Sequence, residues 1–205
     1  MENEFEYYMI ESDGAYQSPA LMCDDDVDPE GIEYLYDMEK AAEGTVTHLT
    51  FRPPYPKKPQ MVDYLFLTGR QVFSRKIYDV LKSQEIKGLQ WVPAVIRGRK
   101  GEKYTDYWVA NVFHKYAFLD PQKTEGVIDE DDGEWIGIDK MVLSEDAASK
   151  VPLDERRVFM VQENSADVLY HKSIVDLIMS VNPQGIVFVP IEKWYNGIFT
   201  NCNFK

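Results

Sequence analysis

The sequence has few of the residues from which disulfide frameworks and metal sites are built. It contains two cysteines, Cys23 and Cys202, and three histidines, His48, His114 and His171. Two cysteines separated by most of the chain favour reduced thiols over a disulfide framework or a zinc site. The histidines share no motif, which favours structural roles for them. We therefore expect neither a metal site nor a cofactor.

Sequence motifs of common enzymes and of calcium loops are also missing. No serine lies in G-x-S-x-G, and the phosphate-binding patterns G-x-x-x-x-G-K-[ST] and G-x-G-x-x-G do not occur. Asp24, Asp26 and Asp28 occupy the first, third and fifth positions of a calcium loop. However, Pro29 stands where that loop requires glycine, and Leu35 stands where it requires glutamate. The sequence therefore predicts no catalytic residues and no calcium site.

Long hydrophobic runs are absent as well. No stretch approaches the roughly 18 apolar residues of a membrane span. The N-terminal "MENEFEYYMIESD" lacks the basic start and apolar centre of a secretory signal. The composition, 44% hydrophobic and 28% charged over 205 residues, is ordinary for a globular domain with one substantial core. We expect a cytoplasmic protein that does not associate with membranes.

Basic residues are nearly missing from the first quarter of the chain. Residues 1–50 contain 14 acidic residues and one lysine, whereas residues 51–205 contain 21 acidic and 21 basic residues. The whole net charge of −13 therefore arises in the first 50 residues. Such a surface repels phosphates, so nucleic acid is not an expected partner. It attracts a basic protein, although acidity that only maintains solubility is an alternative interpretation.

The hydrophobic pattern predicts an α+β fold, with a single domain and a mixed or antiparallel sheet. A helix is expected where Phe73, Ile77, Val80 and Leu81 recur at helical spacing, with Ser74 capping its start. Strands are expected at residues 4–10, 62–68, 89–96, 104–120, 134–144, 156–164 and 185–194.

Proline marks two further features. Four prolines within "RPPYPKKPQ", residues 52–60, predict a loop or linker. Because the preceding residues hold too little apolar material for a separate domain, we interpret residues 1–60 as an acidic N-terminal elaboration and residues 61–205 as the α+β core. Pro93 interrupts an expected strand, which indicates an edge position or a bulge.

One segment of the sequence occurs twice. Residues 74–93, "SRKIYDVLKSQEIKGLQWVP", align without a gap with residues 171–190, "HKSIVDLIMSVNPQGIVFVP". Six positions are identical, namely Ile77 and Ile174, Asp79 and Asp176, Ser83 and Ser180, Gly88 and Gly185, Val92 and Val189, and Pro93 and Pro190. We interpret the regions 74–96 and 171–192 as two pseudo-repeated helix–turn–strand units. Chance similarity is the alternative, because such units share a common pattern.

Several segments in a fixed order carry a resemblance to a known family. They are "VFSRKIYDVLKSQEIKGLQWVPAVI" (72–96), "YWVANVFHKYAFLD" (107–120), "WIGIDKMVLSED" (135–146), "RVFMVQEN" (157–164) and "HKSIVDLIMSVNPQGIVFVPI" (171–191). In order and spacing they resemble bacterial immunity protein family eleven, which was first described as a domain of unknown function. The resemblance covers about residues 62–192, and residues 1–60 fall largely outside it. It implies a partner of a polymorphic toxin delivered between competing bacteria, and it carries over no catalytic residues.

The resemblance implies that the chain binds a cognate toxin domain, and the acidic balance favours a basic one. We expect occlusion of the toxin by an acidic, aromatic-containing surface without catalysis. The candidate partner-binding residues are Asp24, Asp25, Asp26 and Asp28 of one acidic loop, Asp129, Glu130, Asp131 and Asp132 of another, and the neighbouring Tyr34 and Trp135. Two alternatives are an enzyme with an unfamiliar site that reverses the toxin's effect, and a protein-binding module unrelated to toxins.

Overall fold

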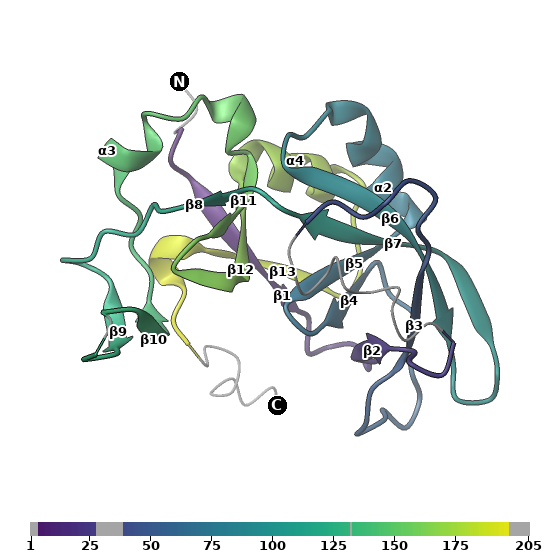
Figure 1. The fold of residues 1–205 in the computed structure, drawn as a ribbon. Coiled ribbons are helices and arrows are strands. Elements are labelled where there is room, and N and C mark those ends of the chain that lie inside the picture. Colours follow the sequence, from purple (N-terminus) through teal and green to yellow (C-terminus); the bar gives the residue numbers. More distant parts are fainter. Residues whose placement is uncertain (1–3, 28–38, 132, 197–205) are drawn as a thin grey trace.

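Strands make up most of the fold, and two strand assemblies lie side by side (Figure 1). The computed structural model describes residues 4–27, 39–131 and 133–196. Within these residues, a six-stranded closed barrel lies beside a five-stranded sheet, and a two-stranded hairpin lies at the end of the molecule away from the barrel. The predicted α+β class, with a single domain and a mixed sheet, is confirmed.

The barrel is built from short strands whose apolar residues fill its interior. In order around the barrel its strands are β2 (Leu21–Cys23), β3 (Thr47–Phe51), β6 (Leu89–Arg97), β7 (Lys103–Val112), β5 (Arg70–Ser74) and β4 (Tyr64–Leu67). Leu49, Val92 and Val109 are among the buried side chains of its core. The barrel closes where β2 pairs with β4 at Leu21 and Leu67, and closure removes the open edges of a sheet.

The five-stranded sheet is buried on both faces. Its order is β13 (Ile186–Pro190), β1 (Tyr7–Ser12), β12 (Asn164–His171), β11 (Val158–Val161) and β8 (Lys115–Tyr116). Successive side chains of a strand point to opposite faces. In β11, Val158 and Met160 therefore pack on the side of the barrel, whereas Phe159 and Val161 pack on the opposite layer, which includes the short helix α3 (Glu145–Ala148).

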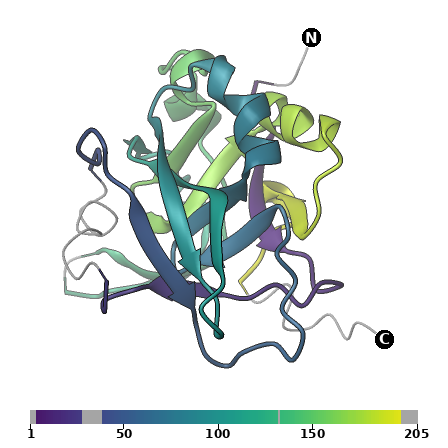
Figure 2. The same ribbon diagram turned by 90° about the vertical axis from the view of Figure 1, so that its right-hand side faces the viewer.

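Two helices cover the junction between the barrel and the sheet. Helix α2 (Arg75–Leu81) follows β5 and helix α4 (Lys172–Ser180) follows β12, and Figure 2 shows them side by side. Ile77 and Ile174 are fully buried in the core that the helices share with both strand assemblies. Short 3-10 helices are η1 (Lys82–Gln84), η2 (Leu153–Glu155) and η3 (Ile191–Lys193).

The two segments of similar sequence have the same local layout. Helix α2 leads through Gly88 to β6, and helix α4 leads through Gly185 to β13. Both glycines have a positive φ, of 75° and 79°, which glycine adopts without steric cost. Strands β5 and β6 both pair antiparallel with β7, and strands β12 and β13 both pair antiparallel with β1. The interpretation of the two units as a repeat stays a prediction.

Details of the first unit differ from the sequence-based expectation. Phe73 belongs to β5 and not to the helix. Ser74 precedes α2, but its hydroxyl donates to Asp63 Oδ1 at 2.6 Å and does not cap the helix. Strand β6 lies between β3 and β7, so an edge position for Pro93 is wrong. The alternative of a bulge agrees with a register shift that follows Ala94.

Residues 1–60 contribute strands to both assemblies. Strand β1 lies between β12 and β13 in the sheet, and strands β2 and β3 form part of the barrel wall. Tyr7, Leu21 and Leu49 are fully buried. The apolar residues of these strands therefore belong to the cores of the barrel and the sheet, and the boundary that we placed at residue 60 stays a prediction.

Candidate protein-binding surface

The hairpin projects from the end of the molecule that lies away from the barrel (Figure 1). At its base, Thr124 Oγ1 donates to Val142 O at 3.2 Å. At its tip, the Asp129 N–H donates to Glu134 O at 2.8 Å and the Gly133 N–H donates to Asp129 O at 3.0 Å. These bonds hold together two antiparallel strands, β9 (Glu125–Ile128) and β10 (Trp135–Lys140).

The hairpin is strongly acidic. Residues 125–139 contain seven acidic residues and no basic residue. Glu130 and Asp131 at the tip are exposed. At the base, Lys140 Nζ lies 3.0 Å from Glu125 Oε1, and this ion pair is itself exposed. Lys140 is the only basic residue of the two strands, and it is paired at the base of the hairpin and not at the acidic tip.

Large hydrophobic side chains of the hairpin are also exposed. Val127 is 56% exposed, Ile128 is 45% exposed and Ile136 is 68% exposed, the largest value for such a side chain among the described residues. Within the described residues, β9 and β10 pair only with each other, so each strand has one edge without a neighbouring strand. Exposed apolar side chains with an acidic surround and open strand edges are typical of protein-binding surfaces.

Trp135 holds the hairpin against the rest of the molecule. Its half-buried ring packs on the apolar cluster that includes Ile138 and Phe159. A Cβ added at Gly126 would lie 3.1 Å from Trp135 Cζ3 and 2.3 Å from Gly137 O. Only glycine therefore allows the two strands and the indole ring to approach this closely.

The other acidic loop has a different environment. Asp24 is 3% exposed, and its Oδ1 lies 2.5 Å from Arg97 Nη2. Asp26 is exposed, yet its Oδ2 lies 3.3 Å from the same guanidinium nitrogen. Asp25 is exposed. Two of these three carboxylates therefore face an arginine of the chain, which reduces the charge that this loop presents to a partner.

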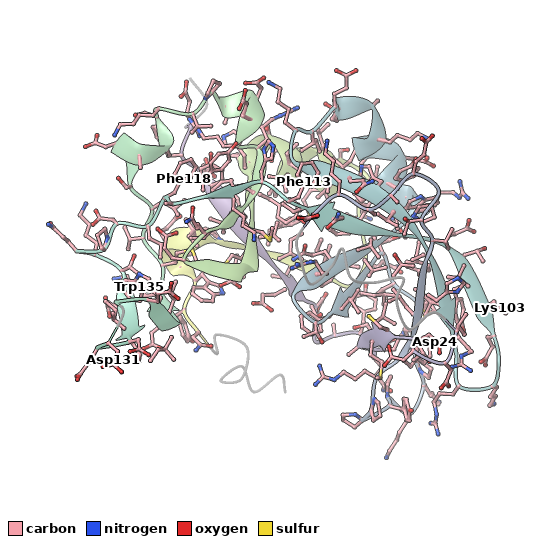
Figure 3. All side chains as sticks on the ribbon, in the orientation of Figure 1. Asp24, Lys103, Phe113, Phe118, Asp131 and Trp135 are labelled. Atoms are coloured by element: carbon pink, nitrogen blue, oxygen red, sulfur yellow. The ribbon has the colours of Figure 1, made fainter. Side chains whose placement is uncertain are left out.

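The structure does not bring the two acidic loops together. Figure 3 shows Asp24 on the barrel, whereas Asp131 and Trp135 lie at the opposite end of the molecule. Asp28, Tyr34 and Asp132 lie outside the described residues.

A groove that the sequence did not reveal lies next to the hairpin. It has a volume of about 500 Å³ and is formed by residues 5–7, residues 140–148 and the start of η3. Lys140, the last residue of β10, is part of its lining. The three segments are far apart in the sequence, and each alone lacks any motif, so no sequence signal indicated the groove.

A smaller cavity lies where the sheet meets the barrel. It has a volume of about 90 Å³ and is lined in part by Glu11, Asp167 and Arg70. Burial, and next the charge of Glu11, raise the pKa of Asp167 to about 6. Burial also raises the pKa of Glu11, and a hydrogen bond from Trp194 opposes this rise. Among the described residues, these are the two carboxylates whose pKa is raised by burial.

Two of the histidines have structural contacts. The imidazole of His171 caps α4, with its Nδ1 3.2 Å from the Ser173 N–H nitrogen. His114 Nδ1 lies 3.2 Å from the Tyr116 hydroxyl. In the part of the chain that the structure describes, no cluster of three or more histidine, cysteine or acidic side chains could hold a metal ion. None of the helices described is long and apolar enough to cross a membrane.

Comparison with protein families identifies the chain. The acidic and apolar hairpin has the features of a protein-binding surface, and the profile of the Immunity protein family (Imm11) matches residues 7–193. The chain therefore belongs to this family, whose members are proteins of toxin immunity. The match begins at the first residue of β1, so our expectation that residues 1–60 fall largely outside the resemblance is wrong. Among curated proteins, the comparison finds no match.

Proposed function

We propose that the chain is an immunity protein that binds a cognate bacterial toxin and neutralises it by occlusion, without catalysis. The toxin domain is basic, and complex formation takes place in the cytoplasm without nucleic acid or membrane. Membership of the immunity protein family supports a toxin as the partner. The hairpin of β9 and β10 supports binding as the mechanism.

One observation carries this proposal, namely the coexistence of exposed apolar and acidic side chains on the hairpin. Burial of the exposed side chains of Val127 and Ile136 by a partner stabilises the complex. The surrounding carboxylates, including Glu130 and Asp131, attract a basic partner and accelerate its encounter. An apolar centre with a charged rim is the common arrangement of protein interfaces.

The hairpin is the principal toxin-binding element in this proposal, and the loop of Asp24 is secondary. Asp24 is turned inward to Arg97, so its main contribution is to the stability of the barrel. Asp25 and Asp26 remain candidates for long-range attraction of the toxin, because both are exposed. Asp28, Asp132 and Tyr34 remain candidates on the sequence pattern alone.

Enzymatic reversal of the toxin's effect is a weaker candidate function. Paired carboxylates with raised pKa values, such as Glu11 and Asp167, are a feature of acid–base catalysis. However, their cavity of about 90 Å³ is smaller than the roughly 300–1,000 Å³ of typical substrate pockets. Occlusion by the exposed surface therefore has the stronger structural support.

Co-purification tests the proposal. The tagged chain is expressed in its native bacterium and recovered with its bound proteins, and the salt concentration of the wash is varied. We expect a stoichiometric toxin domain that is inactive while bound and that dissociates more readily at high salt. Recovery of no protein partner at low salt contradicts the proposal and favours the enzyme.

A further inference from the structure

The groove beside the hairpin has an apolar floor. Tyr7, Met141, Ala148 and Ile191 lie at its base and are each less than a tenth exposed. Half-buried Leu143 adds apolar surface to one wall. A groove of about 500 Å³ is large enough for a short segment of another chain, within the ~300–1,000 Å³ range of ligand sites.

The rim of the groove is acidic. Glu6, Glu145 and Glu192 line it, and Lys140 is the only basic residue of the lining. The ammonium group of Lys140 is paired with Glu125 of β9. The rim therefore carries more negative than positive charge, and it extends the acidic surface of the hairpin.

One wall of the groove is held in place by a buried arginine. Arg156 is 1% exposed. Its Nη1 donates to Glu4 O at 2.7 Å and to the Tyr7 hydroxyl at 2.5 Å. Its Nε donates to Val151 O at 2.9 Å, and its guanidinium carbon lies 5.1 Å from the ring centre of Phe5. These contacts tie the segment that precedes β1 to the layer below it.

The facing wall is held by the start of helix α3. The Ser144 N–H donates to Phe118 O at 2.7 Å, and the Ser144 hydroxyl accepts from the Ala147 N–H at 3.3 Å. The helix cap and the arginine contacts therefore preorganise both walls. A preformed groove binds a partner with a smaller loss of conformational entropy than a surface that must first become ordered.

We infer that this groove is a second contact site for the toxin and that it binds an apolar side chain flanked by lysine or arginine. The floor matches the apolar side chain, and Glu6, Glu145 and Glu192 match the flanking cations. Because Lys140 belongs to both β10 and the groove, the groove adjoins the hairpin, and one toxin can contact both. This inference rests on the proposed function and adds the chemistry of the bound segment.

A second copy of the chain is a poor occupant. The net charge of −13 makes two copies repel each other. A basic segment instead gains favourable interactions with the rim. Self-association and occupation by the chain's own residues 197–205 are outcomes that the experiment separates.

The experiment is a residue-resolved NMR titration of the isotopically labelled full chain. The probe is a short peptide in which leucine and phenylalanine are flanked on each side by two lysines. Its control has two serines in place of the apolar pair. We expect the amide signals of Leu143, Glu145 and Glu192 to shift with the first peptide, at about tenfold lower concentration than with the control. Equal effects of the two peptides, or shifts elsewhere only, overturn the inference.

Two variants test the role of the rim. In E145K/E192K two rim charges are reversed, and in the matched control E39K/E43K two exposed charges on the barrel side are reversed. We expect the first variant to bind the apolar peptide about tenfold more weakly and the control to bind it as the wild type does. Both must retain the wild-type unfolding midpoint. Equal binding by both variants overturns the inference.

Further measurements distinguish this inference from the proposed function and from other occupants. If wild type and E145K/E192K capture the toxin equally well, the groove inference fails and the proposed function stands. If the wild type captures no toxin, the proposed function fails, and the peptide titration still decides whether the groove binds such segments. Concentration-dependent dimers, or groove signals that shift when residues 197–205 are deleted, assign the groove to the chain itself and overturn the inference.

Discussion

The two acidic loops have similar sequences but different surroundings. In the barrel loop, Asp24 is buried against Arg97, and Asp26 faces the same guanidinium. In the hairpin, Glu130 and Asp131 are exposed at the tip. A run of carboxylates in a sequence can therefore mark either an internal ion pair or an exposed binding surface, and only the position of the nearest cation decides between them.

Exposed apolar side chains strengthen this difference. Val127, Ile128 and Ile136 lie on the hairpin beside the acidic tip. Carboxylates attract a partner over a distance, whereas apolar side chains supply free energy only in contact. The hairpin has both properties, which makes it the better candidate for a toxin-binding surface.

A third kind of carboxylate, Asp167, lies inside a cavity. We expect the largest effect on the free energy of unfolding at this residue. Burial and Glu11 raise its pKa to about 6, above the ordinary value of 3.8. Because the folded pKa is raised, the stabilising contribution of the protonated form is fully present below pH 3.8 and is lost as the pH rises through 6. In D167N this loss is absent, so from about pH 4 to 7 the wild type loses up to about 3 kcal/mol more stability than the variant.

Urea unfolding at a series of pH values, followed by tryptophan fluorescence, measures this difference. D167N keeps a polar side chain of similar size in the cavity, so the two proteins differ chiefly in whether residue 167 can ionise. Parallel pH profiles of the wild type and D167N would contradict a raised pKa of Asp167 in the folded protein.

Replacement of Asp24 sharpens the comparison between the two loops. In D24A the Arg97 guanidinium loses its closest carboxylate, and the free energy of unfolding should fall by about 2 kcal/mol. The matched change D131A removes an exposed carboxylate and should alter stability by less than about 0.5 kcal/mol. Denaturant unfolding of both variants is the measurement. Equal losses of stability are incompatible with the difference in their surroundings.

For toxin binding we expect the opposite order, with changes in the hairpin having a larger effect than changes in the barrel loop. We expect E130K/D131K to slow association with the toxin about tenfold at low salt, equivalent to about 1.4 kcal/mol, because it reverses the field at the hairpin tip. The matched variant D25K/E43K reverses two exposed charges on the barrel and should have a smaller effect. Stopped-flow association at two salt concentrations separates them. A larger effect of the barrel variant reverses our assignment.

A single apolar replacement should have the smallest effect. Ile136 is 68% exposed, so I136S should leave the fold intact. It should weaken toxin binding by about 1 kcal/mol, chiefly through faster dissociation. Surface plasmon resonance measures both rate constants. V46S, a change at an exposed valine outside the hairpin, is the control, and equal effects of the two variants exclude a specific contact at Ile136.

The sequence indicated many elements correctly because their patterns are local. The strand expected at residues 156–164 includes β11, a continuous apolar run, and the helix expected in the second helix–turn–strand unit is α4. The boundary at Phe73 was missed because a buried strand runs directly into a helix there, so the two hydrophobic patterns merge.

The candidate site could be predicted only in part. The acidic hairpin was visible as a run of carboxylates before Trp135. The pairing of Asp24 with Arg97 joins residues that are 73 positions apart, and the groove joins Phe5, Leu143 and Ile191. Such contacts depend on how the sheet and barrel are assembled, and no local pattern encodes them.

Hydrogen exchange of the chain, free and bound to its toxin, tests the central claim most directly. The hairpin has open strand edges, so a partner that covers it should slow exchange of its backbone amides. We predict protection of residues 125–140, with little change in residues 24–27 of the barrel loop. Protection confined to the barrel loop, with an unchanged hairpin, would contradict the assignment of the hairpin as the toxin-binding surface.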